Sequence, residues 1–206
     1  MSNCVIFCAG GFNGLAAPIE KGDYVIAADG GYRHTQALGL TPDAILGDFD
    51  SLGFVPENAA VFPVEKDDTD AMLAVRQGLA QGCNRFILYG ALDGARLDHT
   101  VANLQTLLFL AEKGAEGYLV GNTQIAFTVL QSRAFPESCT GTISVFCLGR
   151  DASGVTLENL KYPLTDGTLT AGFPLGVSNH FTGKSATVSV KNGTLLVICD
   201  RQKGIL

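Results

Sequence analysis

Residues 85–114 read RFILYGALDGARLDHTVANLQTLLFLAEKG, and this stretch decides the fold class. The apolar run Arg85 to Tyr89 predicts a buried strand that ends at Gly90. From Leu97 onward apolar residues recur at helical spacing, which predicts one apolar helix face, and Gly114 is typical of a helix end. The residues expected on this face are Val101, Leu104, Leu108 and Ala111. A strand, a glycine turn and a helix in this order indicate one half of a parallel strand–helix–strand unit.

The chain before residue 85 also alternates predicted strands with predicted helices. A second amphipathic helix is predicted to begin near Thr69, with Met72, Val75 and Leu79 on one face. Strands alternating with helices predict an α/β fold, with an N-terminal mostly parallel sheet flanked by helices. The short apolar runs that predict its strands cover residues 5–8, 24–28 and 44–46.

Beyond residue 130 strand signals follow one another without a convincing helix, so we expect a C-terminal antiparallel β-sandwich. Asn192-Gly193 predicts a hairpin turn between the last two strands. The expected domains are residues 1–130 and 131–206. The strand signals of the second domain cover residues 142–148, 154–157, 186–190 and 195–199.

Composition excludes several classes of protein. The 206 residues are 47% hydrophobic and 17% charged, with a net charge of −6, which is a globular balance. The chain has no Lys/Arg run of the kind that indicates nucleic-acid binding. No apolar stretch reaches the ~18 residues of a membrane helix. The start lacks the basic region of a signal peptide, and the six cysteines form no CxxC pair, so we expect a cytoplasmic protein with reduced thiols.

Aspartates follow the predicted strands, at the edge where an open parallel sheet binds ligands. Asp48 and Asp50 lie two apart, so an extended chain would point both to one side. Asp67 and Asp70 lie three apart, so an early helical turn would place both on one face. Converging pairs would form a hard oxygen site suited to Mg²⁺. The alternative is ordinary, because aspartate is common in turns and at helix N-termini, where Asp67 or Asp68 could act as a cap.

The stretch from Gly90 to His99 is a candidate phosphate site. Glycines between a strand and a helix let backbone N–H groups approach an anion, and Arg96 adds a guanidinium fork. Asp98 near the helix start has a cap as its alternative role. His99 is a candidate base, although a surface or core histidine is the commoner case.

Together these motifs resemble the thiamine pyrophosphokinase family, bacterial type. The resemblance covers nearly the whole chain, and its motifs occur in the family's order and spacing. It implies that residues 1–130 form the catalytic ATP- and Mg²⁺-binding domain and that residues 131–206 form the thiamine-binding sandwich. The motifs are Ala28-Asp-Gly-Gly31, Gly47-Asp-Phe-Asp-Ser51, Lys66-Asp-Asp-Thr-Asp70, Gly94-Ala-Arg-Leu-Asp-His99 running into Asn103, and Gly176-Val-Ser-Asn179.

The resemblance implies diphosphate transfer from ATP to thiamine in a homodimer, with thiamine between one subunit's α/β domain and its partner's sandwich. It implies Mg²⁺ held by Asp48, Asp50 and Asp70, and thiamine contacts from Ser178 and Asn179. The implied nucleotide-binding residues are Asp29, Gly30, Lys66, Thr69, Gly90 and Arg96. The implied catalytic residues are Asp70, Asp98 and Arg96.

The chain departs from the family's pattern at the thiamine side. It has no Trp, whereas eukaryotic relatives stack thiamine on one, and it has His180 where many bacterial relatives have Glu. Two alternatives therefore stay open, namely a diphosphokinase acting on a hydroxymethyl pterin and a non-catalytic nucleotide or thiamine sensor. The group that accepts the hydroxyl proton is also open: Asp98 and Asp70 are candidates, and a loose transition state needs no base.

Overall fold

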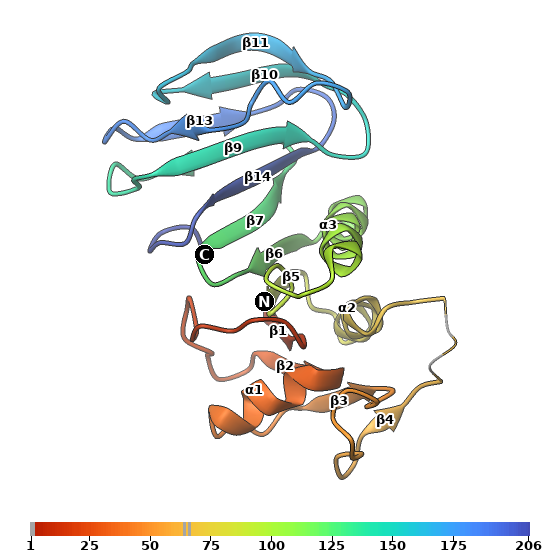
Figure 1. Ribbon diagram of the computed structural model, residues 1–206. Coiled ribbons are helices and arrows are strands. Elements are labelled where there is room, and N and C mark those ends of the chain that lie inside the picture. Colours follow the sequence, from red (N-terminus) through yellow and green to blue (C-terminus); the bar gives the residue numbers. More distant parts are fainter. Residues whose placement is uncertain (1–2, 64, 66) are drawn as a thin grey trace.

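The computed structural model describes residues 3–63, 65 and 67–206 (Figure 1). Strands and helices alternate in the first half. Its elements are β1 (Asn3–Phe7), β2 (Tyr24–Ala28), a 3-10 turn (Asp29–Gly31), α1 (Tyr32–Ala37), β3 (Ala44–Gly47), β4 (Ala60–Val61), α2 (Asp70–Ala80), β5 (Arg85–Tyr89), α3 (Leu97–Glu112), β6 (Glu116–Val120) and β7 (Gln124–Val129). The second half holds β8 (Ser132–Phe135), β9 (Thr142–Cys147), β10 (Ala152–Glu158), β11 (Leu164–Leu169), β12 (Asn179–His180), β13 (Ala186–Ser189) and β14 (Leu195–Asp200).

One large sheet runs through both halves of the protein. Its ten strands follow the order β12-β9-β14-β7-β6-β5-β1-β2-β3-β4. The strands from β6 to β4 are parallel, and those from β7 to β12 join the sheet antiparallel. A second sheet, β11-β10-β13-β8, is wholly antiparallel and caps the top of the molecule in Figure 1. The predicted α/β fold with a C-terminal antiparallel sandwich is thus confirmed.

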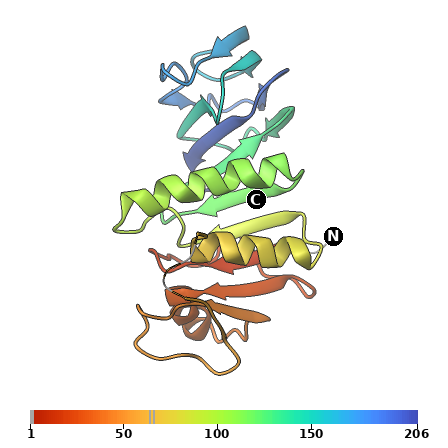
Figure 2. The same cartoon turned by 90° about the vertical axis from the view of Figure 1, so that its right-hand side faces the viewer.

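The two faces of the parallel strands are covered differently. Along β1, Cys4 and Ile6 face the core that α2 and α3 cover, whereas Val5 and Phe7 face the other core. Figure 2 shows α2 and α3 side by side in front of the sheet. α1 lies on the opposite face. The chain moves one way across the sheet from β2 to β3, through α1, and the other way from β4 to β5, through α2. Because such crossovers are right-handed, the two directions put the two helices on opposite faces.

The core on the α1 side continues into the sandwich, where Val145 and Val197 of the large sheet pack with Val188 of the small one. The two halves therefore share one sheet and one hydrophobic core. The division at residue 130, which falls between β7 and β8, stays a prediction.

Two details of the sequence analysis are wrong. Asn192-Gly193 forms no hairpin, because β13 pairs with β8 and β10 while β14 pairs with β7 and β9, so this turn carries the chain from one sheet to the other. The buried face of α3 is also rotated from the expected one: Leu107 and Leu110 are fully buried, while Val101 is 50% exposed. A turn motif does not specify which strands pair on either side of it, and residue spacing does not specify which face of a helix packs on the sheet. Contacts with distant segments decided both features.

Among the described residues, the helices are too short or too polar to cross a membrane.

Candidate active site

A cavity of about 680 Å³ lies beyond the carboxyl ends of the parallel strands. This is where an open α/β sheet binds its ligands. Its lining comes from the segments that follow β1, β2, β3 and β5, from the residues around the start of α2, and from the first turns of α3. Most of the motifs that the sequence analysis singled out in the first half therefore meet in one place.

Close backbone approach explains two glycines of this cavity. Gly90 has a φ of +69°, and a Cβ there would lie 2.5 Å from the Cys8 carbonyl oxygen. A Cβ on Gly10 would overlap the Gly90 carbonyl oxygen, whereas the predicted nucleotide ligand Gly30 is buried and does not line the cavity. The Gly10 N–H donates to the Gly90 carbonyl at 3.0 Å, which ties the turns after β1 and β5 together. Glycine at these positions brings bare backbone to the edge of the cavity, where N–H groups can meet phosphate oxygens.

Three carboxylates converge in the cavity. Asp29, Asp48 and Asp50 each place one oxygen within 4.8 Å of the others. The Ser51 hydroxyl donates to Asp29 Oδ2 at 2.8 Å, while Asp29 Oδ1 is buried and has no hydrogen-bond partner among the described residues. Such a set of hard oxygen donors fits a divalent cation. The sequence analysis put Asp29 with the nucleotide and Asp70 with the metal. Asp70 lines the same cavity outside this three-carboxylate group.

The local reason for this convergence differs from the predicted one. β3 ends at Gly47, and Phe49 adopts a left-handed conformation with φ +60° and only 3% exposure. Asp48 and Asp50 therefore do not lie in an extended chain. A buried aromatic side chain anchors the turn between them, and both carboxylates reach the cavity from this turn.

The acidic segment before α2 also differs from expectation. Thr69 caps the helix, its hydroxyl accepting from the Met72 N–H at 3.2 Å, and the helix begins at Asp70. Asp67 is exposed and precedes the helix, so a common helical face for Asp67 and Asp70 is wrong, as is a cap from Asp67 or Asp68. Asp68, Thr69 and Asp70 line the cavity. The predicted nucleotide ligand Lys66 lies outside the described residues.

Cys8 ends the β1 side of the cavity as a buried thiol. Burial, and after it the negative charge of Asp70, raises the pKa of Cys8 to about 12. The thiol is thus protonated at neutral pH and is not a nucleophile.

Arg96 and Asp98 are paired with each other at the start of α3. Arg96 Nη2 donates to Asp98 Oδ2 at 2.6 Å, and Nε donates to Oδ1 at 3.2 Å. This hydrogen bond lowers the pKa of Asp98 and raises that of Arg96. Both side chains are exposed, and Arg96 lines the cavity together with His99. A carboxylate held ionised by an arginine is a weak proton acceptor.

Side chains of α3 fix the turn after β5. The buried Asn103 donates through Nδ2 to the Ala91 carbonyl at 2.8 Å, and the Thr100 hydroxyl donates to the Leu92 carbonyl at 3.2 Å. Asn103 was predicted only to end a motif, with no role of its own. The available signal was a pair of polar residues three apart in the first turns of a helix that follows a glycine-rich turn.

Ser178 and Asn179 lie at the far edge of the large sheet. Ser178 is exposed, whereas Asn179 is 2% exposed at the start of β12. Asn179 Nδ2 donates to the Tyr162 carbonyl at 2.7 Å, and Oδ1 accepts from the N–H groups of Tyr162 and His180 at 2.9 Å each. β12 is six inter-strand steps from β1, or about 29 Å at ~4.8 Å per step. The structure does not bring these two residues to the aspartates of the same chain.

A mostly parallel sheet with an acidic, glycine-edged cavity beyond its carboxyl ends defines an α/β enzyme of the nucleotide-dependent class. Comparison with known families narrows this class. The model described as "Thiamin pyrophosphokinase, catalytic domain" matches residues 15–119, and "Thiamin pyrophosphokinase, vitamin B1 binding domain" matches residues 133–195. The chain belongs to the thiamine pyrophosphokinase family and is an enzyme of the diphosphokinase class.

Individual relatives agree with this family. Thiamine pyrophosphokinase of Bacillus subtilis (strain 168) is 29% identical over 191 residues, covering 84% of this chain and 85% of the relative. The crystal structure of a thiamin pyrophosphokinase family protein from Enterococcus faecalis has a TM-score of 0.80 at 27% identity, covering 98% of this chain and 100% of that one. The structure from Candida albicans has a TM-score of 0.71 at 16% identity, covering 97% and 88%, and shows likeness of fold alone.

Proposed function

We propose that this protein transfers the diphosphate group of ATP to the hydroxyl of thiamine, giving thiamine diphosphate and AMP. The observation that carries the proposal is the convergence of Asp29, Asp48 and Asp50 in the 680 Å³ cavity, which glycine backbone also lines. The chain that holds this cavity matches both domains of the family. The hydroxyl oxygen of thiamine bonds to the β-phosphorus of ATP, and the bond from that phosphorus to the oxygen bridging the α-phosphate breaks. AMP leaves with the bridging oxygen.

The carboxylates suit Mg²⁺ as the partner of ATP. Asp29, Asp48 and Asp50 would hold the ion, with Asp70 as a further ligand from the start of α2. Bound Mg²⁺ supplies positive charge to the phosphate oxygens. It is needed because five aspartates line this cavity, Asp68 being the fifth, and would otherwise repel ATP.

The remaining polar groups position the phosphates. The backbone of the turn after β5, at Gly90 and Gly94, would offer N–H donors, and Arg96 offers a guanidinium. Arg96 donates to Asp98 in the structure, so contact with a phosphate would shift part of its hydrogen bonding away from that carboxylate. Asp70 is the better candidate to accept the hydroxyl proton, because it lines the cavity and Asp98 does not.

The thiamine side of the site requires a second copy of the chain. Ser178 and Asn179 lie about 29 Å from β1 along the sheet, which is much longer than a thiamine molecule. Beside them the apolar side chains of Phe173, Leu175 and Val177 are 64%, 53% and 49% exposed. A homodimer that sets this edge of one subunit against the cavity of its partner would cover those side chains and bring Ser178 to the substrate.

A cytoplasmic location belongs to the same proposal. All six cysteines are free thiols, five of them buried, as expected of a protein in a reducing compartment that supplies ATP.

The test is a product assay with the purified chain, MgATP and thiamine. We expect one AMP for each thiamine diphosphate and no ADP. Asp50→Asn should lower turnover by about two orders of magnitude or more. Asp67→Asn is the matched control, because Asp67 is exposed and does not line the cavity. Transfer to a hydroxymethyl pterin instead of thiamine, or nucleotide binding without AMP release, would overturn the proposal.

A further inference from the structure

The acidic segment before α2 is tied to the helix by a cation. Arg76 of α2 donates through Nε to Asp68 Oδ2 at 2.8 Å and through Nη2 to Oδ1 at 3.4 Å. The pair bridges eight residues and joins the exposed side of the helix to the segment in front of it. Two roughly parallel N–H···O contacts restrict an arginine–carboxylate pair more than a single contact does.

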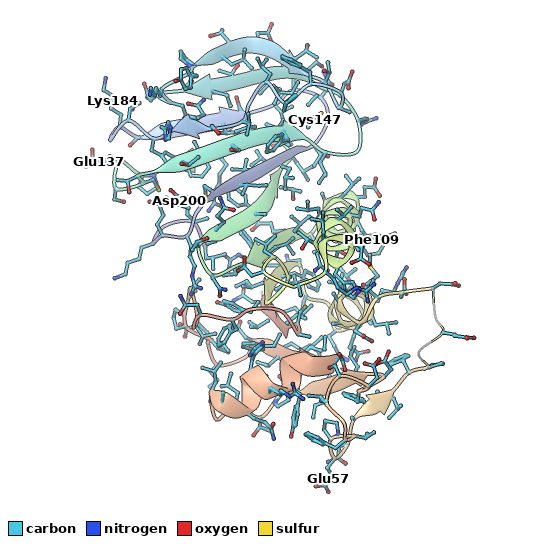
Figure 3. The ribbon with its side chains drawn as sticks, in the orientation of Figure 1. Glu57, Phe109, Glu137, Cys147, Lys184 and Asp200 are labelled. Atoms are coloured by element: carbon cyan, nitrogen blue, oxygen red, sulfur yellow. The ribbon has the colours of Figure 1, made fainter. Side chains whose placement is uncertain are left out.

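The same guanidinium is held from the other side by α3. Its central carbon lies 5.1 Å from the centre of the Phe109 ring. Figure 3 labels Phe109 on α3, which runs beside α2. Lys113 Nζ also lies over this ring, at 5.6 Å. The two cations thus share one aromatic ring, but Arg76 also holds a carboxylate that lines the cavity.

The charge of Asp68 is unfavourable where it stands. The side chain is 28% exposed and lines the cavity along with Asp29, Asp48, Asp50 and Asp70. ATP is itself an anion, and a metal held by the other aspartates does not touch Asp68 in the three-carboxylate group. Without a positive partner, the partly buried carboxylate of Asp68 would repel the phosphates of ATP.

We propose that Arg76 is a positioning residue for the nucleotide: it fixes and neutralises Asp68 so that the cavity accepts ATP. The proposal rests on the function proposed above. It assigns a role in substrate binding to a residue outside the cavity, and it predicts that Asp68 becomes harmful when Arg76 is lost.

The test is steady-state kinetics on the full-length protein at low salt. Arg76→Gln should raise the KM for MgATP about three- to tenfold, with kcat and the KM for thiamine nearly unchanged. Adding Asp68→Asn to Arg76→Gln should return the KM for MgATP to within about twofold of wild type, because the repelling charge is gone. The rise should also shrink at high salt.

Lys113→Gln is the matched control, since it removes the other cation from the Phe109 ring without touching the cavity. It should leave all constants unchanged, and melting temperatures check that each variant is folded. An unchanged KM for MgATP in Arg76→Gln, or a raised KM that Asp68→Asn fails to restore, would overturn the role of Arg76. Absence of AMP release by wild type would instead refute the proposed function, and MgATP binding by calorimetry would then test Arg76 by itself.

Discussion

Two inactive variants should restore each other if the site is shared between subunits. Asp50→Asn disables the carboxylate group near β3, and Ser178→Arg places a large cation at the sheet edge where thiamine, itself a cation, is expected. Ser178 is exposed, so the larger side chain need not disturb the core. Each variant alone should have little activity, because every dimer of one kind carries the same defect in both sites.

The magnitude follows from the geometry. β12 and β3, beside which the two positions lie, are eight inter-strand steps apart in one chain, or about 38 Å at ~4.8 Å per step, so each composite site would take Asp50 from one subunit and Ser178 from the other. In a mixed dimer one site then carries both defects and the other carries neither. Random exchange makes about half of all dimers mixed, so about a quarter of the sites are intact and activity should reach about a quarter of wild type.

The assay measures AMP release after the two variants have been mixed and allowed to exchange subunits. Light scattering tests whether the protein is a dimer, and differently tagged chains that purify together would demonstrate subunit exchange. Asp67→Asn mixed with Ser178→Arg is the control, because every mixed dimer then keeps one intact site and every Asp67→Asn dimer keeps two, so activity should reach about half of wild type whether or not the site is shared. Dimers that exchange without any gain in activity, or a fully active monomer, would refute the shared site.

Three further outcomes follow from individual contacts. Ser51→Ala removes the donor to Asp29 Oδ2 and should weaken Mg²⁺ binding about tenfold, measured as the Mg²⁺ dependence of turnover at fixed ATP; unchanged dependence would contradict the contact's role. Asn179→Ala leaves both backbone groups of Tyr162 without their partner and should lower the free energy of unfolding by about 2–4 kcal/mol in urea, besides raising the KM for thiamine; an unchanged midpoint would show that these bonds are dispensable. The folded-state pKa of Cys8 is about 12, so its reactive thiolate is scarce at pH 8. Mass spectrometry should therefore find Cys8 unmodified by iodoacetamide at pH 8 until urea unfolds the protein. Rapid labelling of the folded protein would contradict this.

The sequence predicted what depends on local pattern. The strands at residues 24–28 and 85–89 have the expected bounds, and Gly114 follows the end of α3 in a left-handed conformation. These segments have dense apolar runs or strong stop signals. The six-residue α1 and the two-residue β4 have neither, so nothing in the chain marked them.

Contacts between distant segments were beyond the sequence. Asp29 and Asp48 were both candidate ligands, but only the pairing of β2 with β3 brings their turns together, and the left-handed Phe49 sets where Asp50 points. Asn179 was expected to face thiamine, and the structure shows how fully its side chain is engaged with Tyr162 and His180. Whether it also meets thiamine stays a prediction.

The shared sheet has a consequence for how the enzyme can close around its substrates. β6 and β7 join the parallel and antiparallel parts edge to edge, and one core runs from Val5 beside β2 to Val188 in the second sheet. Hinge motion between the halves would break strand pairing and expose that core, which costs far more than loop movement. Any closure around the substrates would therefore come from the turns at residues 48–53 and 90–96. Those turns carry Asp50, which would hold the metal ion, and Arg96, which would meet the phosphates, so both groups lie on segments outside the strands and helices.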